Sequence, residues 1–116
     1  MKQKVNVALI TRNLSIVSSR LKFKIMQSEP VDMDTLERNI VCAVYANDTL
    51  VTTEKRLCLN SSDIDNYNNR IFDVELTLNQ STSTSIMQLR IFDVEDMLNP
   101  LIKETVTNNT LIEQDF

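Results

Sequence analysis

The sequence predicts an all-β fold, an immunoglobulin-like or fibronectin-like antiparallel β-sandwich of about seven strands. Apolar and polar residues alternate with a period of two in most segments of the 116-residue chain, and sustained helical periodicity is hard to find. Short polar segments separate the alternating ones, as expected of turns between strands. We expect residues 1–116 to form one β-sandwich domain, the C-terminal domain of a larger protein.

Three strands are expected in the first half of the chain before residue 47. Residues 5–9 alternate between apolar side chains and polar or small ones. Leu21, Phe23 and Ile25 alternate with three cations, so one face of this strand belongs to the core and the other is solvated and basic. Residues 39–46 are apolar on both faces, which is typical of a central strand covered on both sides.

The remaining strands follow at short intervals. Residues 50–53 and 55–59 form either one bent strand or two short ones. Residues 71–78 alternate over a long strand, residues 87–91 over a shorter one, and residues 101–106 begin a last strand.

At most a single helical turn is expected, at residues 36–39. Residues 28–35, 60–69 and 93–100 are polar or acidic and are expected to form loops. The predicted core consists of Leu21, Phe23, Ile25, Ile40, Val44, Phe72, Val74, Leu76, Met87, Leu89 and Ile91.

Turns are expected to depend on asparagine, because the chain contains twelve asparagines and no glycine. Asparagine tolerates the left-handed backbone conformation that tight turns require. The candidate turns between apolar segments are residues 47–48, 68–69 and 108–109. An AT-rich coding sequence would also raise asparagine and lower glycine, and the two explanations are compatible.

An internal repeat relates residues 70–75 to residues 90–95, both of which read Arg-Ile-Phe-Asp-Val-Glu. A functional interpretation would make the two copies duplicated binding edges. In the first copy Phe72 is in phase with the core, whereas in the second copy Phe92 is not. The copies should therefore present opposite faces, which favours coincidence.

The two cysteines are expected to point in opposite directions. Cys42 is in phase with Ile40 and Val44, so it should face the core, and Cys58 should face away from it. A disulfide between them is not expected, and free thiols suit a reducing compartment.

Composition excludes most enzyme classes. The absence of histidine removes the commonest general base and transition-metal ligand. The absence of glycine excludes phosphate-binding loops, dinucleotide-binding turns and nucleophile elbows. We expect no catalytic residue, no cofactor and no metal site in this chain.

The charge balance limits the class of partner. The net charge is −4 and the sequence pI is about 4.7. Nucleic acids and anionic membranes both prefer a basic face, so neither is an expected partner. With six aromatic residues and no tryptophan, the chain has too few rings for a base-stacking platform.

Acidic residues gather in three loops that were considered as calcium sites. The groups are Asp32 and Asp34, then Asp63 and Asp65, then Asp93, Glu95 and Asp96. None matches an EF-hand loop, which also needs a glycine. The segments 63–69 and 93–99 are the best candidates, but acidic residues are ordinary in solvated turns.

Arg20, Lys22 and Lys24 alternate on one strand face and could contact a phosphate or a partner. Cations at alternate positions more often provide solubility and protect a sheet edge. The second interpretation is favoured.

The C-terminal segment 111–116 is the candidate docking element. Leu111, Ile112 and Phe116 carry large apolar surface at a place where chains are usually polar and frayed. These three residues should pack on the domain's own sheet or on the parent protein.

The second half of the chain resembles the C-terminal region of the PglZ family, the alkaline-phosphatase-like component of bacteriophage exclusion (BREX) defence systems. The residues that carry the resemblance are Arg70–Leu78, Phe92–Ile102 and Asn108–Phe116, with residues 20–24 and 28–30 fitting less firmly. The resemblance covers about half of the chain and includes no catalytic motif.

This resemblance implies a large cytoplasmic bacterial protein with a metal-dependent phosphatase-like domain upstream. The family's metal ligands include histidine, which this chain lacks, so no catalytic residue is carried over. The chain would serve stability, or assembly with its parent phosphatase-like domain and other defence-complex proteins. The alternative is an immunoglobulin-like adhesion or ligand-binding module of a bacterial surface protein. A calcium- or sugar-binding sandwich is a third possibility, which the scarcity of aromatic residues disfavours.

Overall fold

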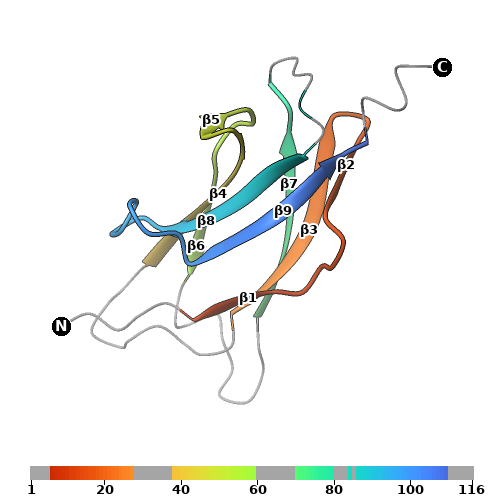
Figure 1. Cartoon of the computed structure of the whole chain (residues 1–116). Helices are drawn as coiled ribbons and strands as arrows, with labels where there is room; N and C mark the ends of the chain where they lie inside the picture. Colours follow the sequence, from red (N-terminus) through yellow and green to blue (C-terminus); the bar gives the residue numbers. More distant parts are fainter. Residues whose placement is uncertain (1–5, 28–37, 60–69, 80–83, 85, 110–116) are drawn as a thin grey trace.

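The structure is a computed structural model that describes residues 6–27, 38–59, 70–79, 84 and 86–109. Every regular element in these residues is a strand, which confirms the all-β prediction. The strands, shown in Figure 1, are β1 (Val7–Leu9), β2 (Ser15–Val17), β3 (Arg20–Gln27), β4 (Arg38–Ala46), β5 (Thr49–Leu50), β6 (Lys55–Leu59), β7 (Arg70–Thr77), β8 (Ile86–Asp93) and β9 (Ile102–Asn108). The described residues contain nine strands in place of the expected seven, because β2 was not predicted and β5 and β6 are separate.

The strands form two groups around the two longest antiparallel pairings. In the first group, β3 pairs with β7 along one edge and with β1 and β2 along the other. In the second group, β4 pairs with β8 along one edge and with β5 and β6 along the other, and β9 extends the group beyond β8. Figure 1 shows β8 and β9 passing in front of β7.

Strand β2 joins the two groups and makes the sheet mixed. It pairs antiparallel with β3 and parallel with β9. Two hydrogen bonds form the parallel contact, from Thr107 N–H to the Leu14 carbonyl at 3.0 Å and from Asn109 N–H to the Ile16 carbonyl at 2.8 Å. A purely antiparallel architecture is therefore wrong. After β1 the chain continues along the same edge of β3 to β2, which also pairs with β9, and local alternation does not reveal this second pairing.

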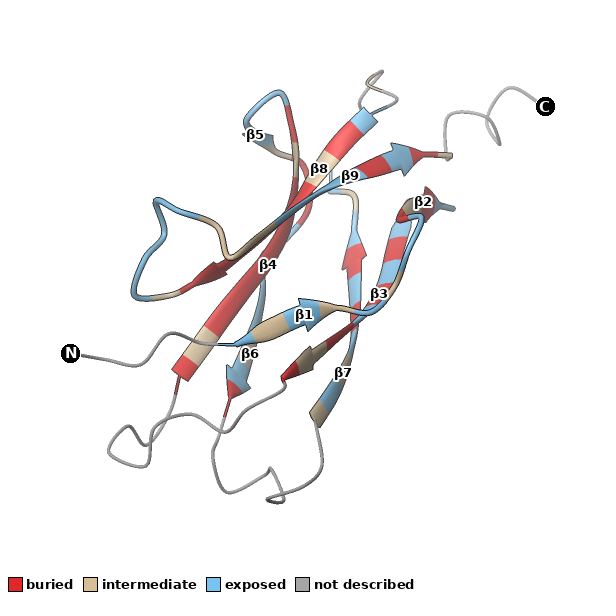
Figure 2. Cartoon of the chain, turned by 60° about the horizontal axis from the view of Figure 1, so that its bottom comes forward, coloured by how far each residue is buried: buried red, intermediate tan, exposed pale blue. Residues whose placement is uncertain are grey.

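One hydrophobic cluster contains buried side chains from both groups. Every predicted core residue belongs to it except Phe72, which is partly buried and packs against it. The cluster also takes in Cys42, which was separately expected to face the core, and buried apolar residues that the prediction left out, namely Leu14, Ile16, Ala46, Val51, Leu59 and Val106. Figure 2 shows β3 alternating between buried and exposed positions, as its sequence predicts.

Strand β4 is buried on both faces, as predicted, and it is coloured as buried along most of its length in Figure 2. Val41 and Ala43 point away from the main cluster and are nevertheless buried. Their cross-strand neighbours on β8 are Phe92 and Arg90. These long side chains stand beside the small ones and limit their contact with solvent.

The turn predictions had mixed outcomes. Asn47 and Asp48 form the two-residue turn between β4 and β5, with φ of 50° and 66°, as expected of residues that tolerate the left-handed region. Asn108 is instead buried in β9, where its Nδ2 donates to the Thr84 carbonyl at 3.3 Å. The prediction of a helical turn at residues 36–39 is wrong for Arg38 and Asn39, which begin β4, and residues 36–37 lie outside the described residues. Residues 68–69 lie outside the described residues.

Two predictions about strand phase are confirmed: the two copies of the repeat present opposite faces, and the two cysteines point in opposite directions. In the repeat, Ile91 is in the core and Ile71 is 55% exposed, so the two copies are out of phase. Cys42 is buried, Cys58 is exposed, and both are free thiols. Burial raises the pKa of the Cys42 thiol to about 12.

Candidate functional site

Several residues proposed from the sequence lie outside the described part of the chain. They are the docking candidates Leu111, Ile112 and Phe116 and the acidic residues Asp32, Asp34, Asp63 and Asp65. Those interpretations remain predictions. The third acidic group and the basic stripe are both described.

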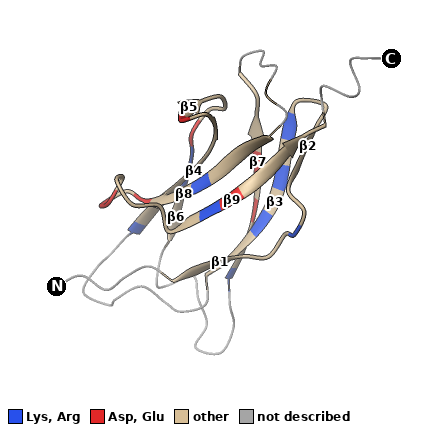
Figure 3. Ribbon diagram, in the orientation of Figure 1, with Lys and Arg blue, Asp and Glu red and all other residues tan. Residues whose placement is uncertain are grey.

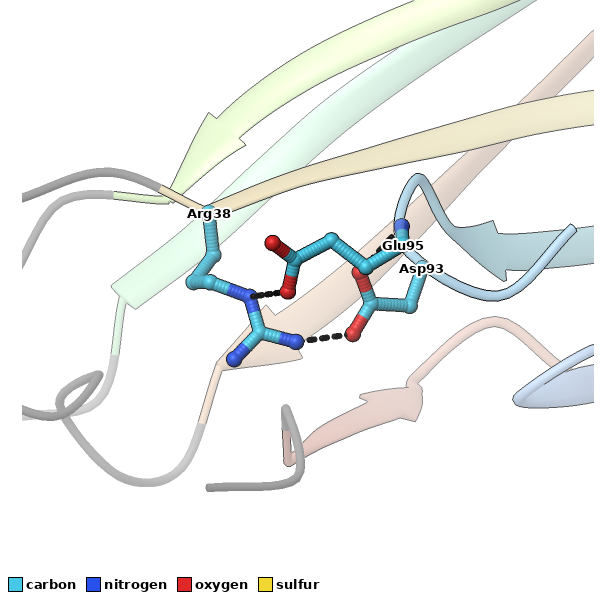
Figure 4. Close-up of polar contacts among 3 residues, drawn as sticks. All are labelled: Arg38, Asp93 and Glu95. Atoms are coloured by element: carbon cyan, nitrogen blue, oxygen red, sulfur yellow. Dashed lines mark hydrogen bonds and ion pairs between the residues drawn. The ribbon is translucent and has the colours of Figure 1, made fainter. Parts of the chain in front are cut away.

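The acidic turn after β8 is organised around one buried arginine. Arg38, at the start of β4, is 5% exposed and forms an ion pair with Asp93 at the end of β8. Its Nε also lies 3.3 Å from a carboxylate oxygen of Glu95. Figure 4 shows both carboxylates directed at the one guanidinium. The pairing compensates the buried charges and attaches the turn to β4.

The remaining polar groups of this turn hold its backbone. Asp93 accepts hydrogen bonds from Glu95 N–H through its side chain, at 3.0 Å, and from Asp96 N–H through its carbonyl, at 2.8 Å. The Asp96 carboxylate accepts from Leu98 N–H at 3.2 Å and from Asn99 N–H at 3.3 Å. These are structural roles of a kind common for aspartate in turns. The described residues contain no group of three His, Cys, Asp or Glu placed to hold a metal.

The basic stripe of β3 lies beside acidic residues of β7. Arg20 forms an ion pair with Glu75 at 3.5 Å, and Lys24 forms one with Asp73 at 3.2 Å. Figure 3 shows the cations as blue bands along β3. Edge protection is the wrong explanation for them, because β3 has strands on both sides. The pairs are exposed to solvent, so each contributes little to stability.

The strongest candidate for a binding surface is the outward face of β4, β8 and β9, here called the Tyr45 face. It consists of the residues that point away from the main cluster, namely Val41, Ala43, Tyr45, Ile86, Gln88, Arg90, Phe92, Lys103 and Thr105. The composition is unusual for a solvated sheet face, which normally carries polar residues at alternate positions.

Aromatic and arginine side chains contact one another on this face. The rings of Tyr45 and Phe92 meet edge to face, with centroids 6.4 Å apart and planes at 78°. The Arg90 guanidinium lies 4.4 Å from the centre of the Tyr45 ring. Its Nε donates to Gln88 Oε1 at 2.7 Å, and its Nη2 donates to the Asp48 carboxylate. Arg90 is thus held over the ring by contacts within this chain.

Burial raises the pKa of the Tyr45 hydroxyl, the nearby Glu54 carboxylate raises it further, and Arg90 opposes the increase. The phenol therefore remains protonated at neutral pH and is able to donate one hydrogen bond. The surface offers an aromatic body with a polar tip, a combination that is frequent at protein interfaces.

The sequence prediction missed this surface. It treated Tyr45 only as part of a doubly apolar strand and Phe92 only as a residue out of phase with the core. The sequence did contain a signal for this surface. Once β4 and β8 are paired, Tyr45, Phe92, Gln88 and Arg90 all point to the same outward face. The pairing itself could not be read from either strand alone.

Comparisons with protein-family models, curated proteins and solved structures gave no match for this chain. Within the described ranges, no helix is long and apolar enough to span a membrane. The contacts of the Tyr45 face are therefore the main support for a functional assignment.

Proposed function

We propose that this chain is a non-catalytic β-sandwich domain of immunoglobulin-like topology that serves stability or assembly by docking a partner protein on its Tyr45 face. The partner is the phosphatase-like domain of a PglZ-type parent in a cytoplasmic bacteriophage-defence assembly, with other proteins of that assembly as further partners.

The order of strand pairing supports an immunoglobulin-like topology. Such sandwiches place their first, second, fourth and fifth strands in one sheet and their third, sixth and seventh in the other. The pairings of β1, β3 and β7, and of β4, β8 and β9, fit these two sets. Strand β6 then corresponds to the additional strand on the edge of the second sheet, beside β4.

The observation that carries the binding role is the fixed Arg90 over the Tyr45 ring on an outward sheet face, with Phe92, 6% exposed, supporting the Tyr45 ring from its edge. Tyrosine, phenylalanine and arginine are enriched at interface cores, whereas lysine and glutamate are depleted there. Arg90 is already held by Gln88 and Asp48, so docking would cost little side-chain entropy. Ile86, 63% exposed, extends this surface with apolar area.

The assignment of the partner depends on the resemblance of residues 70–116 to the PglZ family. The lack of histidine in the whole chain supports a role without catalysis. A domain of this kind contributes surface to an assembly and leaves the chemistry to its parent.

A matched pair of isoleucine substitutions tests the proposal. Ile86→Asp places a carboxylate on the Tyr45 face, and Ile71→Asp places one on the outward face of β7. The two side chains are 63% and 55% exposed, so neither substitution should lower the melting temperature appreciably. Calorimetric titration with the phosphatase-like domain of the parent should show about tenfold weaker binding for Ile86→Asp alone, since burying an uncompensated charge costs more than 1.4 kcal/mol. Equal binding by both variants would refute the docking role of this face.

A further inference from the structure

Strand β7 is an eight-residue edge strand whose backbone orientation can be assigned. It pairs with β3 without a bulge, residue for residue, from Arg20↔Thr77 to Gln27↔Arg70. Leu78 N–H donates to the Ser19 carbonyl at 2.9 Å, so even-numbered residues of this segment direct their backbone groups toward β3. The odd-numbered residues 71, 73 and 75 direct theirs away from β3.

The outward edge already accepts an extended segment at its C-terminal end. Asn79 N–H donates to the Val51 carbonyl at 3.0 Å, and Thr52 forms an antiparallel bridge with Leu78. Between residues 71 and 75, no strand in the described part of the chain pairs with this edge. An incoming strand would therefore continue a line of pairing that the chain has begun.

Strand β7 has few of the features that usually protect a sheet edge. It contains no proline and no bulge, and it is longer than the other described edge strands. Strand β6 has five residues and begins with Lys55 and Arg56, whereas β1 and β5 have three and two residues. Short length and the cations at the start of β6 protect those edges, whereas the outward charges of β7 are the carboxylates of Asp73 and Glu75.

We propose that the β7 edge binds an extended segment of a partner protein that carries cations at alternate positions. The strand would add antiparallel or parallel to residues 71–75, with its cations beside Asp73 and Glu75. This contact lies on a different strand from the Tyr45 face and does not depend on it.

Charge spacing supports this choice of partner. Asp73 and Glu75 point to the same side of β7, and a guest side chain would stand one strand spacing away, about 4.8 Å. The guest cations would lie two strand spacings, about 9.6 Å, from the cations of β3. This distance is close to the screening length in physiological salt, so repulsion between the two sets of cations would be weak. Each carboxylate would then have a cation on both sides.

A second copy of the chain fits this edge poorly. The outward backbone groups belong to odd-numbered residues, so antiparallel pairing of two β7 edges must place odd-numbered residues opposite one another. The registers that pair at least five residues of the segment 71–77 set Asp73 against Asp73, Glu75 against Glu75, or one against the other. Like charges directly opposite are destabilising.

The test uses the full chain and a synthetic probe, the amidated and acetylated peptide Thr-Val-Lys-Val-Lys-Val-Thr, with a control peptide in which glutamate replaces both lysines. Amide hydrogen exchange by NMR should be fast at residues 71, 73 and 75 in the free chain and slower with the lysine peptide. The glutamate peptide should bind about tenfold more weakly, because two cross-strand charge pairs change sign.

Two variants separate edge pairing from unspecific attraction. Ile71→Pro removes an outward N–H without removing a bond to β3, so the fold should persist while peptide binding falls. The double variant Asp73→Lys and Glu75→Lys should reverse the preference and bind the glutamate peptide. The two new lysines stand directly opposite Lys24 and Lys22, so this variant should be less stable than the parent chain, and its NMR spectrum is used to confirm that it is folded before the titration.

Three results would overturn the proposal. Slow exchange at residues 71, 73 and 75 in the free monomeric chain would mean that this chain already covers its own edge. Equal binding of both peptides would remove the charge specificity. Concentration-dependent self-association abolished by Ile71→Pro would identify a second copy as the occupant.

Discussion

The buried ion cluster of Arg38, Asp93 and Glu95 allows a quantitative test of what holds the turn after β8 to β4. Arg38→Met removes the cation and leaves two carboxylates facing the site. The side chain of Asp93 is 10% exposed and that of Glu95 is 42% exposed. Removing one partner of a buried pair costs about 3–5 kcal/mol because the other charge stays desolvated.

Asp93→Asn should cost less, about 1.5–3 kcal/mol, the range for a hydrogen bond to a charged group. Arg38 retains its contact with Glu95 in this variant, and the asparagine oxygen is still able to accept from Glu95 N–H. The double variant Arg38→Met with Asp93→Leu should recover most of the loss, since it replaces both charges with apolar side chains.

Urea unfolding followed by circular dichroism measures all three free energies. With the single variant Asp93→Leu added, the double-mutant cycle of Arg38→Met and Asp93→Leu should give a coupling energy of about 2 kcal/mol or more between Arg38 and Asp93. A cost below about 1 kcal/mol for Arg38→Met, or a double variant that loses the sum of the single losses, would refute the reasoning.

The remaining predictions concern the turn before β3, the core and the thiols. Ser19 has φ of 65°, so Ser19→Gly should stabilise the fold by about 1 kcal/mol, measured as a shift in urea midpoint at constant m value. Phe23→Ala should cost about 3–5 kcal/mol, and Phe72→Ala should cost clearly less because Phe72 is only partly buried. Equal losses would contradict the burial pattern. Cys58 should react with a thiol reagent in the folded chain, whereas Cys42 should react only on unfolding. Because the Cys42 thiol has a pKa of about 12 when folded and an ordinary value of 9.0, stability should fall as pH rises above 9, by up to about 1.4 kcal/mol per unit. Cys42→Ala should remove that slope.

Local alternation determined much of this fold in advance. Side chains point to opposite faces at successive strand positions, so the phase of a few residues fixes which face is buried. This reasoning correctly placed Cys42 inward and Cys58 outward, and it separated the two copies of the Arg-Ile-Phe-Asp-Val-Glu repeat. It also identified Asn47 and Asp48 as a turn, because their conformational tolerance is a property of the residues themselves.

The expected strands were largely correct, but their neighbours could not be assigned. The basic stripe of β3 was read as protection of an edge, although β3 is an interior strand. Strand β2 was missed because three residues are too few for a clear period, and its burial depends on β9, about ninety residues later. The docking interpretation of residues 111–116 remains a prediction.

By itself, the sequence determined that the described residues form strands, which faces of those strands are buried, and that the chain contains no histidine and no glycine. Only the tertiary structure decided what lies across each strand. Arg38 meets Asp93 across 55 residues of sequence, and Arg90 meets Asp48 across 42. The physical reason is that alternation is a local property of a strand, whereas the register and order of strands depend on the packing of the whole core.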